Sequence, residues 1–135
     1  GEGPVAFDAD VIIYAAATDH PLGARVRPLI ERTDVAAIGS VLLLPEVLAK
    51  PMRTDASSAE VAALIGILSR LELLPLDAAA ARLAVALAAR HRLRAADAAH
   101  LATAVAAGAE QFVTNNRKDF PRSITEINVV YPSDL

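Results

Sequence analysis

Short apolar runs alternate with longer segments of helical periodicity along this chain. The runs have the length of buried strands, and the pattern predicts strands at residues 5–7, 35–39, 73–76, 111–114 and 128–131. The periodic segments between them predict helices at 11–17, from Pro21 onward, around Glu46, and at 57–71, 77–91 and 95–107. This alternation favours βα units. We therefore expect an α/β fold, with three α/β/α layers around a mainly parallel sheet of about four or five short strands.

Single residues predict how several of these helices begin and end. Pro28 is expected to bend or interrupt the second helix, because proline lacks a backbone N–H. Ser57 with Glu60 has the pattern of a capping box. Asp77 is expected to cap the helix that follows it, and Gly108 is expected to end the last one.

The composition indicates one aliphatic domain that covers residues 1–135. Apolar residues make up 54% of the chain and aromatic residues only 4%, so the core is expected to consist of Ala, Leu, Val and Ile. No stretch of about 18 apolar residues runs without a charge, which argues against a membrane span. The absence of Cys excludes disulfides and thiolate metal sites, and it fits a cytoplasmic protein. Residues 1–3 lack a Met and are interpreted as an expression remnant.

Three carboxylates, Asp8, Glu46 and Asp97, lie where a strand gives way to a helix or in the first turn of a helix. Residues that follow parallel strands are expected to share one edge of the sheet, where ligands bind. Crowded carboxylates repel one another, and Mg²⁺ prefers oxygen ligands, so the pattern favours a divalent-metal site. The alternative for each acid is a helix cap or a favourable contact with the helix dipole. Between Asp8 and Asp10, the cap is expected at Asp10.

Polar and basic groups follow a strand in the segment 113–120 (VTNNRKDF). This segment is either an exposed turn or the source of a fourth metal-site oxygen, from Asn116 or Asp119, and of cations for phosphate. His100 lies one helical turn after Asp97. It either flanks the site or is a satisfied or surface histidine.

Four segments in order resemble the motifs of PIN domains, and their spacing and the total length resemble small PIN-domain toxins of VapC type. The first is 7–14 (FDADVIIY), with one Asp after a strand and another two places later. The second is Ser40 with Glu46. The third and fourth are 93–104 (LRAADAAHLATA) and 113–120, so the likeness spans nearly the whole chain.

The resemblance implies a Mg²⁺- or Mn²⁺-dependent ribonuclease, a homodimer without membrane association, which cleaves RNA and is held inactive by a small antitoxin protein. It implies Asp8, Glu46 and Asp97 as metal-site residues and Asn116 as a fourth catalytic position, where many relatives carry Asp. Asp119 is displaced by what corresponds to a one-residue insertion. An Asn at the fourth position would weaken a second metal site. The residues expected to contact the substrate are Ser40, Thr114 and Arg117.

Two other functions are left open by the sequence. The segment 8–11 also fits the nucleophile motif of haloacid-dehalogenase-like phosphatases, with Asp8 attacking phosphorus and Asp10 as the acid/base. The paired acids that such enzymes carry after a late strand would, however, fall at 115–116, which are both Asn. The other alternative is a non-catalytic PIN-like interaction module. In addition, the apolar segment 61–68 is either core or part of a dimer or antitoxin surface.

Overall fold

Within residues 3–135, which the computed structural model describes, five parallel strands form one sheet at the centre of the molecule. The strands are β1 (Val5–Phe7), β2 (Ala37–Ser40), β3 (Glu72–Leu74), β4 (Gln111–Val113) and β5 (Asn128–Val130), in the spatial order β3-β2-β1-β4-β5. The helices are α1 (Ala9–Ala16), α2 (Pro21–Glu31), α3 (Leu43–Asp55), α4 (Ala59–Leu68), α5 (Ala78–His91) and α6 (Ala95–Ala106), and a 3-10 turn, η1 (Pro132–Asp134), follows β5. The expected α/β/α architecture is confirmed.

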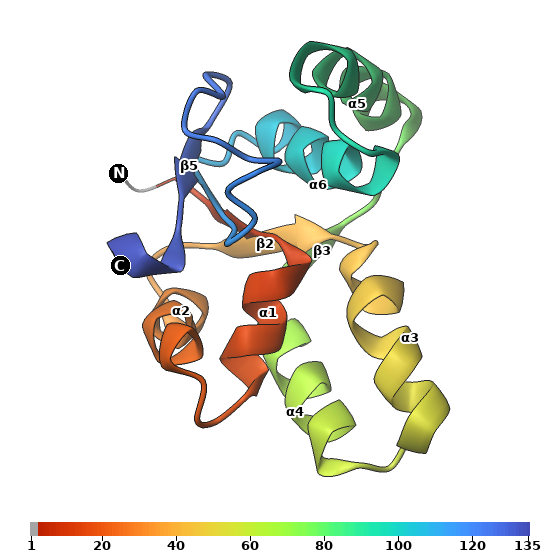
Figure 1. Cartoon of the computed structure of the whole chain (residues 1–135), viewed down its shortest axis with the longest axis vertical. Helices are drawn as coiled ribbons and strands as arrows, with labels where there is room; N and C mark the ends of the chain where they lie inside the picture. Colours follow the sequence, from red (N-terminus) through yellow and green to blue (C-terminus); the bar gives the residue numbers. More distant parts are fainter. Residues whose placement is uncertain (1–2) are drawn as a thin grey trace.

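The sheet separates two hydrophobic cores. Helices α1 to α4 lie on one face, and α5 and α6 lie on the other (Figure 1). Successive strand residues point to opposite faces, so Phe7 belongs to the first core and Ala6 to the second. Both cores are mainly aliphatic, as the composition predicted, and Phe112 packs edge-on against Phe120 in the second.

The order of the strands creates a crevice next to β1. The chain runs from β1 to β2 and β3 on one side, and it returns to the other side of β1 to form β4 and β5. In open parallel sheets, such a reversal leaves a crevice outside the carboxyl ends of the strands. Asp8 follows β1 directly and Thr114 follows β4, so both residues lie at this crevice.

Several local predictions are confirmed. The five expected strands all form, with small differences at their ends. Asp77 caps α5 by accepting a hydrogen bond from the backbone N–H of Ala80 at 2.8 Å. Gly108 follows α6 with a φ of +71°, a left-handed conformation that glycine adopts without strain.

Other local predictions are corrected. Pro28 does not interrupt helix α2, because the buried Val26 and Ile30 on either side keep that face packed against the core. The cap of α4 is Ser58, whose hydroxyl accepts from the backbone N–H of Val61. The Ser57 hydroxyl instead donates to the carboxylate of Asp55. The turn η1 was not expected. The interpretation of residues 1–3 concerns Gly1 and Glu2, which lie outside the described residues.

No helix within residues 3–135 combines the length and the hydropathy of a membrane-spanning segment.

Candidate active site at the carboxyl edge of the sheet

Asp8 occupies the centre of the crevice and is only 6% exposed. Its backbone N–H donates to the carbonyl of Val113 at 2.9 Å, which ties the end of β1 to β4. One carboxylate oxygen accepts from the backbone N–H of Ala9 at 2.9 Å, and the other accepts from the Thr114 hydroxyl at 2.8 Å. Burial raises the pKa of Asp8 above its usual value. The hydrogen bonds therefore hold the Asp8 side chain in a place where burial disfavours its ionised form.

Asp8, and not Asp10, is the N-cap of α1, which corrects the expectation for this pair. Asp10 lies in the first turn, where its carboxylate accepts from the backbone N–H of Asn115 at 3.0 Å and so fixes the start of the 114–120 loop. Burial, together with the charge of Asp8, raises the pKa of Asp10 to about 6. The cap falls at Asp8 because the residue directly after a strand still has extended backbone geometry.

Asp97 reaches the same crevice from α6, on the opposite face of the sheet. It lies in the first turn of that helix and is partly buried. Burial raises its pKa, and the charges of Asp8 and Asp119 raise it further. Carboxylates influence one another in this way only when they are close. The structure therefore brings Asp8 and Asp97 together from segments that are far apart in the sequence.

Glu46 approaches from α3. Its charge also raises the pKa of Asp8 and of Asp97, as the smallest of the causes that act on each. A carboxylate oxygen of Glu46 lies 3.0 Å from Nε2 of His100, a contact between α3 and α6. The first turn of α3 is positioned by Ser40, whose buried hydroxyl accepts from the backbone N–H of Leu42 at 3.1 Å.

The two candidates for the fourth position, Asn116 and Asp119, bond to each other within the 114–120 loop. The side-chain amide of Asn116 donates to the carboxylate of Asp119 at 2.9 Å, and its carbonyl oxygen accepts from the backbone N–H of Asp119. The charge of Asp119 raises the pKa of Asp97, so Asp119 lies close to the other carboxylates. Its hydrogen bonds with Asn116 orient it there. The sequence alone left these two residues undecided.

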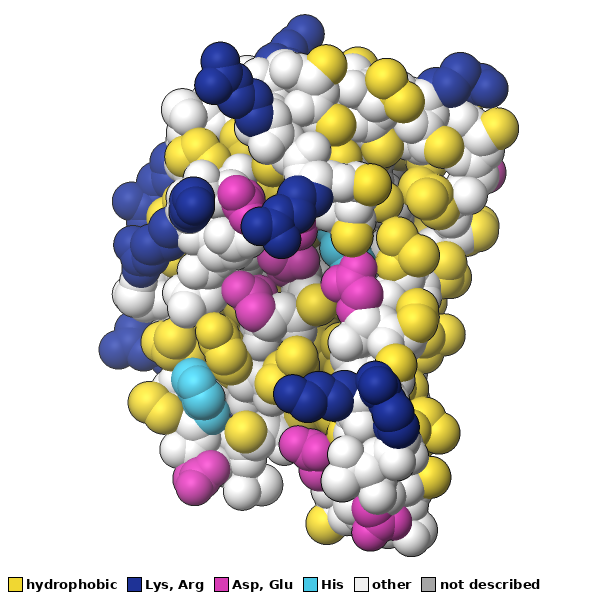
Figure 2. Space-filling view, turned by 45° about the vertical axis from the view of Figure 1, so that its right-hand side comes forward, with side chains coloured by type: hydrophobic (Ala, Val, Ile, Leu, Met, Phe, Trp, Pro, Cys, Tyr) yellow, Lys and Arg dark blue, Asp and Glu magenta, His cyan; other side chains and the backbone are white. Residues whose placement is uncertain are grey.

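Together, Asp8, Glu46, Asp97 and Asp119 form what we call the acidic edge. Figure 2 shows acidic side chains gathered in the middle of one face, next to a histidine and with Lys and Arg side chains around them. No three Asp, Glu or His side chains within residues 3–135 are arranged to hold a metal ion as they stand. The donor chemistry nevertheless fits Mg²⁺ or Mn²⁺, because these are hard carboxylate oxygens and Mg²⁺ uses few of them together with water. Their raised pKa values also indicate an edge that a cation would stabilise.

The residues expected to contact the substrate differ in their accessibility. Ser40 and Thr114 are buried, and their hydroxyls are engaged with Leu42, Asp8 and the backbone N–H of Asn116. This favours a supporting role for both residues. Arg117 is exposed and lies over the ring of Tyr131, 4.4 Å from its centroid.

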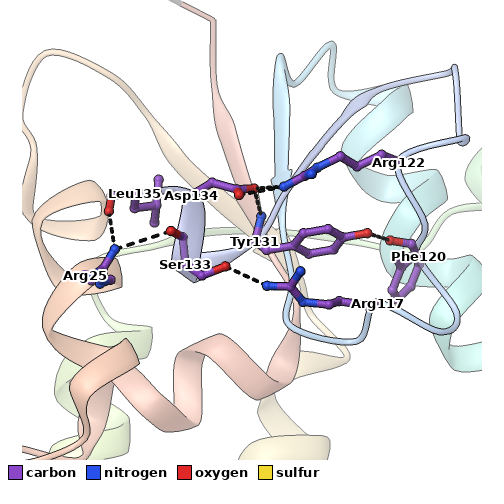
Figure 3. Close-up of polar contacts among 8 residues, drawn as sticks. All are labelled: Arg25, Arg117, Phe120, Arg122, Tyr131, Ser133, Asp134 and Leu135. Atoms are coloured by element: carbon purple, nitrogen blue, oxygen red, sulfur yellow. Dashed lines mark hydrogen bonds and ion pairs between the residues drawn. The ribbon is translucent and has the colours of Figure 1, made fainter.

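A second charged group, not foreseen from the sequence, surrounds Tyr131. We call it the Arg–Tyr cluster, and it consists of Arg25, Arg117, Arg122, Tyr131, Ser133 and Asp134. Figure 3 shows the two loop arginines on opposite sides of the tyrosine ring. Arg117 donates to the Ser133 hydroxyl and Arg122 to the Asp134 carboxylate, each at 2.6 Å. The sequence shows Arg117 and Arg122 before the last strand, but it does not show their partners, Ser133 and Asp134, which follow that strand.

Three solved structures share this fold. A toxin–antitoxin complex from Klebsiella pneumoniae matches with a TM-score of 0.72 and 24% identity, covering 95% of this chain and 97% of that one. VapBC2 from Rickettsia felis, bound to a DNA fragment from the promoter, gives 0.71 and 20% identity over 94% and 97%. DNA-bound VapBC from Salmonella typhimurium gives 0.75 and 22% identity over 96% and 98%.

No curated protein matches the chain in sequence. A family model, that of the PIN domain, matches residues 5–123. This match includes all four carboxylates of the acidic edge as well as Asn116. The chain therefore belongs to the PIN domain family.

Proposed function

We propose that this protein is a metal-dependent ribonuclease, the toxin of a toxin–antitoxin pair. The single observation that carries the proposal is the convergence of Asp8, Asp97 and Glu46 on one crevice, where burial raises the pKa of both aspartates and the charge of Asp8 raises that of Asp97 further. Anionic side chains gathered in this way need a cation. The likeness in fold to solved toxin–antitoxin complexes adds the biological setting.

Each side chain has a distinct task in this proposal. Asp8 and Asp97 would hold Mg²⁺ or Mn²⁺, and Glu46 would contribute directly or through water. When bound, such an ion polarises a phosphate oxygen and activates a water molecule for hydrolysis. Thr114 keeps the Asp8 carboxylate turned towards the crevice through its 2.8 Å hydrogen bond. Because a water molecule is the nucleophile in this proposal, Asp8 acts as a metal ligand and forms no covalent intermediate.

The loop after β4 supplies the remaining groups. Asp119, oriented by Asn116, completes the acidic edge as the fourth acid. Arg117 and Lys118 are exposed next to it and bind the phosphate backbone of the RNA. A net charge of −3 gives little general attraction to nucleic acid, so RNA binding depends on these local cations.

We propose a small antitoxin as the protein partner. Helices α3 and α4 form an apolar groove lined by Leu44, Leu48, Ile65, Leu68 and Leu73. Leu44 is 41% and Ile65 48% exposed, whereas Val61, Leu64 and Leu68 are buried, so the segment 61–68 serves both as core and as surface. An amphipathic segment of an antitoxin suits such a groove. The exposed Val85 on α5 offers apolar area for a homodimer, and an RNA substrate implies a cytoplasmic location.

The test is incubation of the purified protein and its Asp8→Asn variant with a mixed RNA pool, with Mn²⁺ or with EDTA. We expect cleavage only by the wild type with Mn²⁺. The variant loses on the order of 10²-fold or more, because a lost ligand removes several kcal/mol of charge stabilisation. Asp77→Asn is the matched control, since the same change at the cap of α5 lies away from the acidic edge. Millimolar Mn²⁺ should also raise the melting temperature of the wild type but not that of Asp8→Asn.

Other outcomes would point to the rival functions. Undiminished RNA cleavage by Asp8→Asn, or cleavage in EDTA, contradicts the proposal. Hydrolysis of p-nitrophenyl phosphate with a trapped aspartyl-phosphate indicates a phosphatase, which the PIN family match argues against. Firm association with a small partner, without Mn²⁺ binding, indicates a non-catalytic interaction module.

A further inference from the structure

His100 is the most deeply buried histidine of the described chain, and its burial is unusual for a side chain with two polar nitrogens. It lies on α6, one helical turn after Asp97, and its side chain is only 1% exposed. Buried polar atoms are nearly always hydrogen-bonded. Each of the two ring nitrogens therefore needs an explanation.

The two nitrogens differ sharply in their surroundings. Nε2 lies 3.0 Å from Oε1 of Glu46. Nδ1 is buried and has no hydrogen-bond partner within residues 3–135. A carboxylate oxygen can only accept, so Nε2 carries the hydrogen of the contact with Glu46. The imidazole thus makes one bond, aimed at one carboxylate, while its other nitrogen is left without a partner.

Packing alone gives no reason to keep such a side chain here. An apolar residue of similar volume would fill the space without leaving a buried nitrogen unsatisfied. A buried nitrogen without a hydrogen-bond partner is expected at a residue that contributes to function more than to stability. The contact also bridges the two layers of the molecule, because α6 and α3 lie on opposite faces of the sheet (Figure 1).

The bond leaves Glu46 partly available. Its side chain is 34% exposed, and the contact with His100 engages one of its two oxygens. Glu46 is a long, flexible side chain at the start of a helix, and no other hydrogen bond within the described residues holds its carboxylate. Its direction relative to Asp8 and Asp97 therefore depends on His100.

We propose that His100 is a positioning residue that holds the Glu46 carboxylate towards Asp8 and Asp97 and so tunes metal binding. The inference rests on the proposed function, because it assigns the residue that prepares Glu46 for the ion. Hydrogen-bond partners of metal ligands typically change metal affinity by about 10–100-fold when they are removed. His100 acts through Glu46 and does not itself touch the substrate.

A pair of substitutions separates the hydrogen bond from the packing. In His100→Gln the side-chain amide nitrogen can occupy the place of Nε2 and can donate to Glu46. In His100→Asn the amide is shorter and corresponds to Nδ1, so it cannot reach Glu46. Both variants are polar, and they differ in whether they provide the donor.

The chain offers a matched control in His91. Its Nε2 also contacts a carboxylate, that of Glu126, at 2.9 Å, and its side chain is only 16% exposed. This pair ties the end of α5 to the loop before β5, and neither residue is among the groups whose charges shift the pKa of Asp8 or Asp97. His91→Asn therefore removes a similar His–Glu bond and is expected to affect stability alone.

The experiment measures Mn²⁺ affinity by calorimetry and RNA cleavage as a function of Mn²⁺ for the wild type and these three variants. We expect His100→Asn to weaken Mn²⁺ binding by about tenfold or more, with cleavage largely recovered at high Mn²⁺. His100→Gln should stay within about threefold of the wild type, and His91→Asn should bind Mn²⁺ as the wild type does. If His100→Asn binds Mn²⁺ with wild-type affinity, or if His100→Gln is as impaired as His100→Asn, the inference is wrong.

Failure of the proposed function gives a different result. In that case the wild type itself neither binds Mn²⁺ nor cleaves RNA, and the inference falls with it. Should His100→Asn not fold, ¹⁵N spectra of the histidine rings in the folded protein decide. The expected pattern is a hydrogen on Nε2 of His100, with a resonance that moves in Glu46→Gln. A hydrogen on Nδ1 alone, or no response to Glu46→Gln, overturns the inference.

Discussion

The acidic edge and the Arg–Tyr cluster are the two most highly charged regions described above, and they differ in how their charges are paired. In the Arg–Tyr cluster, Arg122 forms an ion pair with Asp134 and lowers the pKa of that carboxyl group. In the acidic edge, the neighbours of Asp97 include further carboxylates, and its pKa is raised. The charges of Arg122 and Asp134 are therefore paired within the protein, whereas the pKa values of Asp8 and Asp97 stay raised even though the charge of His100 lowers both.

This difference shows how to separate a structural group of charges from a functional one. The Arg–Tyr cluster joins the 114–120 loop, η1 and α2, so its bonds hold the end of the chain against the body of the domain. The acidic edge brings together carboxylates from the end of β1, from α3, from α6 and from the 114–120 loop, and the charges of Asp8 and Asp119 raise the pKa of Asp97. Repulsion that persists in a folded protein indicates a ligand-binding role.

The largest expected effect is that of Asp97→Asn. RNA cleavage with Mn²⁺ should fall by about 10²–10³-fold, because a metal ligand supplies several kcal/mol to the transition state. The pKa of Asp97 is raised by folding, so its ionised form opposes folding at neutral pH. In EDTA the variant should therefore melt at the same temperature as the wild type or higher. A clearly lower melting temperature together with retained cleavage would show that Asp97 is structural.

A smaller effect is expected from the fourth acid. Asp119→Asn should lower cleavage by about tenfold, and Asn116→Ala should lower it less, since Asn116 acts by orienting Asp119. Cleavage rates at saturating and limiting Mn²⁺ measure both variants. If Asn116→Ala is the more damaging change, Asn116 itself occupies the fourth position of the site.

In the Arg–Tyr cluster, Tyr131→Phe should affect stability and leave the chemistry unchanged. The buried Tyr131 hydroxyl donates to the carbonyl of Phe120 at 2.7 Å. Loss of this bond should lower the free energy of unfolding by about 1 kcal/mol, measured by urea denaturation. Cleavage at saturating Mn²⁺ should match the wild type. A loss of cleavage without a loss of stability would extend the active site to this cluster.

The smallest expected effect concerns pH. Arg122 lowers the folded-state pKa of Asp134 below its usual value, so the ionised carboxylate stabilises the fold. This contribution is fully present above the unfolded pKa of 3.8 and is lost as the pH falls through the lower folded value. Both side chains are exposed, so melts between pH 5 and pH 3 should show only a slight additional loss in the wild type compared with Asp134→Asn. An equal acid response of the two proteins would show that this ion pair does not contribute.

The sequence determined the fold to a large extent. Hydrophobic runs such as 5–7 and 35–39 have a local signature, because a strand buried on both faces is expected to be apolar throughout. Asp77 and Gly108 act within one helical turn, so their roles could also be predicted. The cap at Ser57 was misjudged because a local rule does not distinguish two adjacent serines, and the interruption at Pro28 was misjudged because packing against the core lies beyond a local rule.

The sequence also placed Asp8, Glu46 and Asp97 at the starts of helices, which made a shared crevice a reasonable hypothesis. Only the tertiary structure decided which groups meet there: that Thr114 holds Asp8, that Asp119 faces Asp97, and that His100 reaches Glu46. Secondary structure follows from periodicity over a few residues, which the chain carries locally. Contacts between distant side chains depend on strand order and on the way helices pack across the sheet, and no local pattern records them.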